Sequence, residues 1–227
     1  MARMGGFPSL SQLILALSLA LATSMPAAAQ PCCGPITPDG QRLAAFLNAS
    51  NVGQLWLAHE HILWRTGQPD PARSGYSRGT HCSAYAAAMA LRAGVPLLHP
   101  PEHGQRDLAN AQFLWLEGPG AVAGWRPVDA ETAQGFANQG FFVLAVFENP
   151  NPAKPGHIAI LRPSEKSLGA LQTDGPEEAQ AGEHNFTATS IAHGFAGHRG
   201  AWRPGGTGAI RFFAHKVDWT RLPAPTS

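Results

Sequence analysis

Two apolar segments in the second half of the chain constrain its fold most strongly. Residues 141–147 are seven consecutive apolar residues, and residues 157–161 are a second apolar run that begins with a histidine. Continuous apolar runs of this length are typical of strands that are buried on both faces. Further strands are predicted near residues 178–182 and 210–214. The second half of the chain is therefore predicted to form a sheet.

The first half of the chain is predicted to contain helices. We expect them at residues 38–47, 52–64, 82–93, 105–116 and 130–139, with turns or loops at 66–81, 96–104 and 118–124. The helix at 82–93 is the clearest, because Ala86 to Leu91 are strong helix formers and Gly94 provides a C-terminal stop. Helices followed by strands favour an α+β fold, in which an antiparallel sheet packs against the helix that begins at Cys82.

The N-terminus resembles an export signal. Residues 13–22 are an apolar core of about ten residues, and the three alanines at 27–29 offer small residues for cleavage. The apolar run is shorter than the ~18 residues that a membrane span needs. We therefore expect a signal peptide at residues 1–29, no stable membrane anchor, a periplasmic or secreted protein, and a single domain at residues 30–227.

The composition bears on the partners of the protein, and it leaves the pairing of the cysteines undecided. The formal net charge is +1, which gives no reason to expect a nucleic-acid partner. Export permits disulfides, and the chain has three cysteines. Cys32 and Cys33 are adjacent in an arm rich in Pro and Gly, and their pairing stays open. A bridge from Cys82 to either of them is the structural alternative to a reactive Cys82.

Cys82 and His157 are the predicted nucleophile and general base. A thiol in the first turn of a helix lies near free amide groups and the positive end of the helix dipole, which favour the thiolate. His157 follows Gly156 at the start of a buried strand, where the backbone can approach another element closely. An imidazole within hydrogen-bond reach of a cysteine turns it into an efficient nucleophile. The backbone N–H of Cys82 is expected to contribute to an oxyanion hole.

A polar side chain on the next strand is expected to orient His157. If residues 156–162 and 176–182 form a hairpin in which 162 pairs with 175, His157 lies opposite Gln180, whose amide oxygen can accept from the imidazole. Asn185, Gln172 and Asp174 are alternatives. Tyr76 and Trp125 are candidates to line the substrate groove. The histidines are scattered rather than spaced as ligands, so neither a metal nor a cofactor is expected.

These motifs resemble those of the NlpC/P60 and CHAP cell-wall hydrolases. Cys82-Ser83 at a helix start is similar to the NlpC/P60 cysteine motif, and Gly156-His157-Ile158-Ala159 is close to the Gly-His-Val-Ala of CHAP domains. Tyr76 matches a tyrosine that is usual upstream of the cysteine. The resemblance covers about residues 74–190. It implies a papain-like α+β fold and a cysteine amidase or endopeptidase that cuts amide bonds in peptidoglycan stem peptides through a thioester. His81 stands where NlpC/P60 members usually have aspartate.

Two other interpretations remain open. The helix from Cys82 also resembles the cysteine helix of transglutaminase-like proteins, and residues 124–129 resemble the strand that carries their aspartate, here Asp129. That resemblance implies acyl transfer, but residues 110–117 lack the histidine expected before Asp129. In the third interpretation the chain is a non-catalytic periplasmic binding or inhibitor protein, with Cys82 buried or disulfide-bonded.

Overall fold

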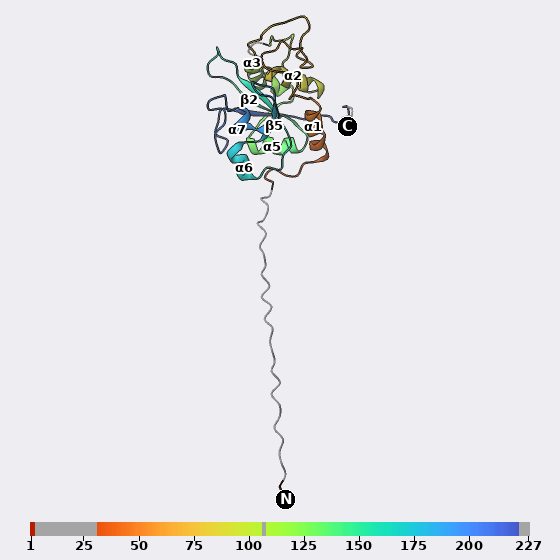
Figure 1. Ribbon diagram of the computed structural model, residues 1–227, viewed down its shortest axis with the longest axis vertical. Coiled ribbons are helices and arrows are strands. Elements are labelled where there is room, and N and C mark those ends of the chain that lie inside the picture. Colours follow the sequence, from red (N-terminus) through yellow and green to blue (C-terminus); the bar gives the residue numbers. More distant parts are fainter. Residues whose placement is uncertain (3–30, 106–107, 223–227) are drawn as a thin grey trace.

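A single antiparallel sheet lies at the centre of the computed structural model, which describes residues 1–2, 31–105 and 108–222 (Figure 1). Within these residues the sheet has six strands, in the order β1-β6-β2-β3-β4-β5. The strands are β1 Arg126–Val128, β2 Phe142–Phe147, β3 His157–Leu161, β4 Glu177–Gln180, β5 Phe186–Ser190 and β6 Arg211–His215. The predicted α+β class with an antiparallel sheet is therefore confirmed.

Helices cover both faces of this sheet. They are α1 Pro38–Asn48, α2 Cys82–Arg92, α3 Leu108–Glu117, α4 Pro119–Val122, α5 Ala130–Asn138, α6 Leu168–Asp174 and α7 Ile191–Gly194. Figure 1 shows α2 and α3 on one side of the sheet and α5 and α6 on the other. No helix among the described residues is long and apolar enough to cross a membrane.

The central strands are the two apolar runs. Every residue of β2 and of β3 is buried, as expected for strands covered on both faces. In their pairing Leu144 lies opposite Ile160 and Phe147 lies opposite His157. The predicted helix at the cysteine is also present, because α2 begins at Cys82 and Gly94 adopts a positive φ of 67° just after its end.

The helix predicted at residues 52–64 is wrong. This segment consists of turns, bends and one isolated bridge at Ile62, and within it Trp56 and His59 take positive φ values that no α-helix accommodates. The segment wraps around the fully buried Trp56, whose indole N–H donates to the carbonyl of Trp64 at 2.9 Å. The free energy gained by burying Trp56 thus outweighs the helical preference of residues 52–64. The expected turn at 118–124 contains α4, the connection between the two strands of the predicted hairpin contains α6, and β5 and α7 were not predicted.

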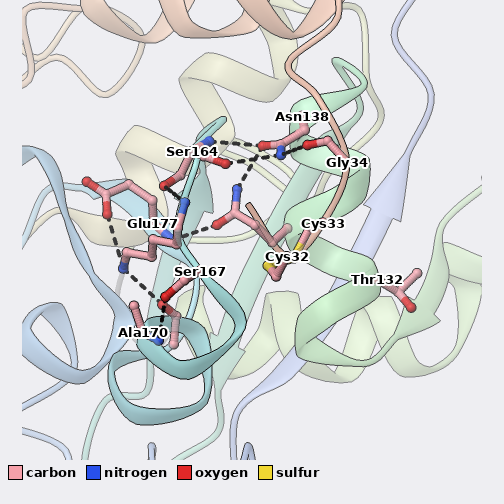
Figure 2. Close-up of a disulfide and its surroundings, with 12 residues drawn as sticks. Cys32, Cys33, Gly34, Thr132, Asn138, Ser164, Ser167, Ala170 and Glu177 are labelled. Atoms are coloured by element: carbon pink, nitrogen blue, oxygen red, sulfur yellow. Dashed lines mark hydrogen bonds and ion pairs between the residues drawn. A yellow bond between two sulfur atoms is a disulfide. The ribbon is translucent and has the colours of Figure 1, made fainter. Parts of the chain in front are cut away.

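Two buried amides on α5 hold the ends of β3 and β4 together. Gln134 donates to the carbonyl of Arg162 and accepts from the amide of Glu177, each at 2.9 Å. Asn138 donates to the carbonyl of Ser164 at 3.1 Å and accepts from its amide at 2.9 Å. Asn138 also donates to Gly34 at 3.0 Å and so ties down the N-terminal arm, as Figure 2 shows. We call Gln134 and Asn138 the α5 clamp.

The cysteines divide into a bonded pair and a free thiol. Cys32 and Cys33 form a disulfide with each other in the arm beside α5 (Figure 2). Cys82 is free and buried, so the structure does not contain the alternative bridge from Cys82 to the arm. The predicted signal peptide lies almost wholly outside the described residues.

We expect Asn138→Ala to destabilise the fold strongly, because it removes a fully buried side chain together with its hydrogen bonds to the backbone of Gly34 and Ser164. The free energy of unfolding should fall by about 2 kcal/mol or more. Urea unfolding followed by tryptophan fluorescence measures this quantity. Gln139→Ala, at the exposed neighbouring position, is the control and should change it little. Equal stabilities of the two variants would show that the clamp is not needed.

Candidate active site

Cys82 opens α2 with its sulfur against the sheet. Its side chain is 5% exposed, and the sulfur lies against the backbone amides of Ile158, Ser83 and Cys82 itself. His81, at the N-cap position, makes no side-chain cap, because its ring turns away to the carbonyl of Glu60 at 2.9 Å. The first-turn amides of α2 are therefore left to the sulfur and to whatever binds beside it.

Burial reverses the expected ionisation of this thiol. Desolvation raises the pKa of Cys82, and the three neighbouring amides only partly oppose it. The helix start does lower the pKa of Cys82, as expected, but burial raises it by more. At this position the hydration free energy that a charged sulfur loses exceeds the stabilisation that the amide groups and the helix dipole provide.

His157 begins β3 directly beside the amide that contacts Cys82. A side chain at Gly156 would overlap Asn110 Oδ1 and the carbonyl of Phe147, so only glycine allows this close approach to α3 and β2. The His157 ring is 4% exposed. Burial lowers the pKa of His157 to about 4, although its hydrogen bond to Gln180 acts in the opposite direction. The resting pair is therefore a neutral thiol and a neutral imidazole.

Gln180 fixes the tautomer of His157. The amide nitrogen of Gln180 donates to the carbonyls of His184 and Gly194, both at 3.3 Å. Its oxygen must then face His157 Nε2, which lies 2.5 Å away. The proton of the neutral imidazole is consequently on Nε2, and Nδ1 keeps the lone pair that a general base needs.

The hairpin register that suggested Gln180 is wrong by two residues. Ile160 lies opposite Ala179, and Arg162 bonds to Glu177 rather than pairing with residue 175. Continued along β3, this register brings His157 level with Gly182, and a Cβ at Gly182 would lie 3.5 Å from His157 Cε1. Since side chains alternate between faces, a shift of two residues keeps Gln180 on the face of His157, one diagonal step away.

The other candidates for the third residue lie elsewhere. Asn185 donates to the carbonyls of Val52 and Leu55, both at 2.8 Å, and accepts from Gly182 at 2.9 Å. It ties the β4–β5 turn to the segment around Trp56. Gln172 and Asp174 are on α6. Of the four candidates, Gln180 is the one that the structure bonds to His157.

The two predicted groove residues occupy very different places. Trp125 is 3% exposed, donates to the carbonyl of Pro96 at 2.7 Å and packs edge-on against Phe142, so it belongs to the core rather than to a groove. Tyr76 is 70% exposed and stacks on His59 with ring centroids 5.0 Å apart. His59 in turn lies 3.0 Å from Glu183, next to the glycine that contacts His157.

Two rings that sequence reasoning missed enclose His157. His198 stacks on it with centroids 4.9 Å apart, and Phe195 meets it edge-on at 4.6 Å. Burial and the neighbouring His157 lower the pKa of His198 to about 4. Both rings follow α7, and no local pattern signals their approach to a strand forty residues earlier in the chain. They shield the bond between His157 and Gln180 from water.

A buried carboxyl lies beside Gln180 on the same face of β4. Glu178 is fully buried, and neither of its oxygens has a hydrogen-bond partner in the part of the chain that the structure describes. It lies so close to Gly194 that a side chain there would overlap it. Burial raises the pKa of Glu178 well above its ordinary value, with a smaller contribution from Glu177. Burial therefore favours the neutral form of the Glu178 carboxyl.

Asp129 lies away from Cys82 and His157. Its carboxylate caps α5 by accepting from the amide of Thr132 at 2.7 Å. It follows β1, and β6 and β2 separate β1 from β3. A transglutaminase-like pairing of Cys82 with Asp129 finds no support in this arrangement. Among residues 1–2, 31–105 and 108–222, no three His, Cys, Asp or Glu side chains are grouped to hold a metal ion.

No protein-family model matches the chain, and no curated protein matches it significantly. The functional interpretation therefore depends on the geometry of the site and on the motifs.

We expect Cys82 to react as a neutral, buried thiol. Its alkylation by iodoacetamide should be slow at pH 7 and should rise continuously through pH 9, because the raised pKa leaves little thiolate below that pH. Mass spectrometry of the protein as a function of pH gives the profile, and the same chain in urea supplies the reference, with a midpoint near about 8.5. A rate that is constant between pH 5 and 8 would instead indicate a preformed thiolate.

We expect Glu178→Gln to change how stability depends on pH. As pH rises above about 4.3, the unfolded chain loses this proton while the folded protein keeps it, so the free energy of unfolding falls by up to about 1.4 kcal/mol per pH unit. The variant lacks this decline. The difference between its free energy of unfolding and that of the wild type should therefore grow from pH 5 to pH 8 in urea titrations. Glu165→Gln, at an exposed position, is the control. Parallel curves for Glu178→Gln and the wild type would contradict the buried neutral acid.

Proposed function

We propose that residues 30–227 form an exported cysteine hydrolase with a papain-like active site, which cuts amide bonds in peptidoglycan stem peptides. The observation that carries this proposal is the joint placement of Cys82 and His157. The sulfur at the start of α2 lies against the amide of Ile158, and the adjacent His157 is held by Gln180 with Nδ1 unprotonated. The proposal that the protein is exported is based on the leader-like segment at residues 1–29. The proposal that its substrate is the cell wall is based on the motif resemblance.

The proposed reaction begins from the neutral pair. As the sulfur of Cys82 attacks the amide carbon, its proton passes to His157 Nδ1, so general-base catalysis replaces a stored thiolate. The amides of the first turn of α2, which have no side-chain cap, stabilise the developing oxyanion. Gln180 accepts from Nε2–H and thereby stabilises the imidazolium that forms.

The leaving amine then takes the proton from His157 Nδ1, and a thioester to Cys82 remains. His157, again neutral, removes a proton from water, and the hydroxide attacks the thioester carbon. The carboxylic acid product departs, and the sulfur recovers its proton from His157. Each proton that His157 accepts is returned, so the cycle needs no other acid, base or cofactor.

We expect purified wild type to release new peptides from solubilised peptidoglycan fragments, and Cys82→Ala to release none above background. Loss of the nucleophile should lower kcat by roughly 1000-fold or more. Mass spectrometry of the products identifies the bond. Gln180→Ala should lower kcat by at least about tenfold by freeing the tautomer of His157, whereas Gln172→Ala, on α6, is the matched control.

Other outcomes separate the alternatives. New amide products on addition of a primary amine, without hydrolysis, would favour an acyl transferase. An absence of cleavage together with a thiol that stays unreactive even at pH 10 would favour a non-catalytic binding or inhibitor protein.

A further inference from the structure

A cavity lined by His81, the residue directly before Cys82, carries more charged side chains than the site that holds His157. It has a volume of about 630 Å³ and lies between residues 60–62 and 73–81. We call it the entry groove. Its lining includes Glu60, His61, Ile62, Arg73, Arg78 and His81. The groove thus extends to the residue directly before the proposed nucleophile.

Backbone hydrogen bonds fix the wall that carries Arg78. The amide of Ser77 donates to the carbonyl of His59 at 2.9 Å, and the amide of His59 donates to the carbonyl of Gly79 at 3.0 Å. Arg78 stands between these two bonds. Its side chain is exposed, but the backbone from which it extends is tied to the opposite wall of the groove.

A second set of bonds fixes Arg73. The amide of Asp70 donates to the carbonyl of His61 at 2.8 Å, and the amide of Arg73 donates to the carbonyl of Asp70 at 3.1 Å. The Asp70 carboxylate also accepts from the amide of Ala72 at 3.0 Å, which closes the turn. Both arginines therefore extend from backbone that is anchored to residues 59–61.

The two guanidinium groups are free to take a ligand. Among the described residues neither Arg73 nor Arg78 forms an ion pair or a side-chain hydrogen bond, whereas Arg42 pairs with Asp39 and Arg162 bonds to Asn48. Among the described residues that line the groove, Glu60 is the one carboxylate, against two guanidinium groups. The carboxylate of Glu183 is already engaged by His59, the residue before the groove wall at 60–62. An arginine fork binds a carboxylate through two parallel hydrogen bonds.

The direction of the reaction decides which part of a substrate enters this groove. In the proposed reaction His157 protonates the leaving amine, so the amine lies on the side of His157, Gln180 and Gly182. None of these residues lines the entry groove, which is built from the segment before Cys82 and from residues 60–62. This assigns the amine to the side away from the groove, and the acyl part of the substrate to the side of Cys82 on which His81 and the groove lie.

We propose that the entry groove is a carboxylate-binding subsite, in which Arg73 and Arg78 bind a free carboxylate on the acyl side of the amide that is cut. This inference rests on the proposed function. It makes the enzyme selective for acidic acyl donors over their amidated forms, and it places the selectivity in two residues outside the catalytic group.

Binding and cleavage are tested separately. The affinity of the Cys82→Ala variant is measured by calorimetry for solubilised peptidoglycan fragments, before and after their carboxylates are converted to carboxamides. We expect amidation to raise Kd by about tenfold or more, since the charge-assisted bonds are lost. Arg78→Gln and Arg73→Gln, each added to Cys82→Ala, should weaken binding of the free fragments to a similar extent and leave binding of the amidated fragments unchanged.

The control is Arg203→Gln, an exposed arginine outside the groove, which should leave both affinities unchanged. Binding that is insensitive to amidation and to both groove arginines, or no binding of the free fragments, would overturn the subsite. Cleavage by the protein with intact Cys82 reports on the proposed function alone. Cleavage that continues equally on amidated fragments refutes the subsite but not the hydrolase, whereas arginine-dependent binding without any cleavage refutes the hydrolase but not the subsite.

Discussion

The geometry of the candidate active site depends on the hydrogen bonds of the Gln134 side chain. Its side chain joins the carbonyl of Arg162 to the amide of Glu177, and these two residues also bond directly across β3 and β4. Fixing this pair fixes the register of the whole hairpin. A slip of one residue would turn Gln180 to the opposite face of the sheet and leave His157 without its acceptor. A buried amide on α5 therefore determines the geometry of two side chains on other elements.

Desolvation is the dominant electrostatic effect in this site. Interaction with a helix N-terminus stabilises an anion by roughly 0.3–1 kcal/mol, or about 2 kcal/mol in favourable buried geometry. Burial shifts a pKa by up to 3–5 units, at about 1.4 kcal/mol per unit. Burial therefore prevails at Cys82, as it does at His157, His198 and Glu178. Each of these shifts favours the uncharged form of its group, so we expect proton transfer to accompany the reaction of the sulfur.

The sequence predicted what depends on local pattern. The start of α2, the strands β2 and β3 and the need for glycine at 156 follow from composition and apolar runs. Gln180 was found despite the wrong register, because alternation fixes the face even when the pairing partner is off by two residues. Residues 52–64 were mistaken for a helix, and the contact of His198 with His157 was not predicted. Both depend on contacts with distant parts of the chain, around Trp56 and His157, which no local pattern encodes.

The two sides of Cys82 therefore suit different tasks. On the side of His157 the groups are neutral and shielded by Phe195 and His198, which favours proton transfer between weakly hydrated partners. On the other side, Arg73 and Arg78 are exposed cations on anchored backbone. A charge bound there is screened by water and adds little field at the sulfur. In the proposed reaction, substrate affinity can thus come from the charged subsite at Arg73 and Arg78. Binding there does not require Cys82 or His157 to become ionised.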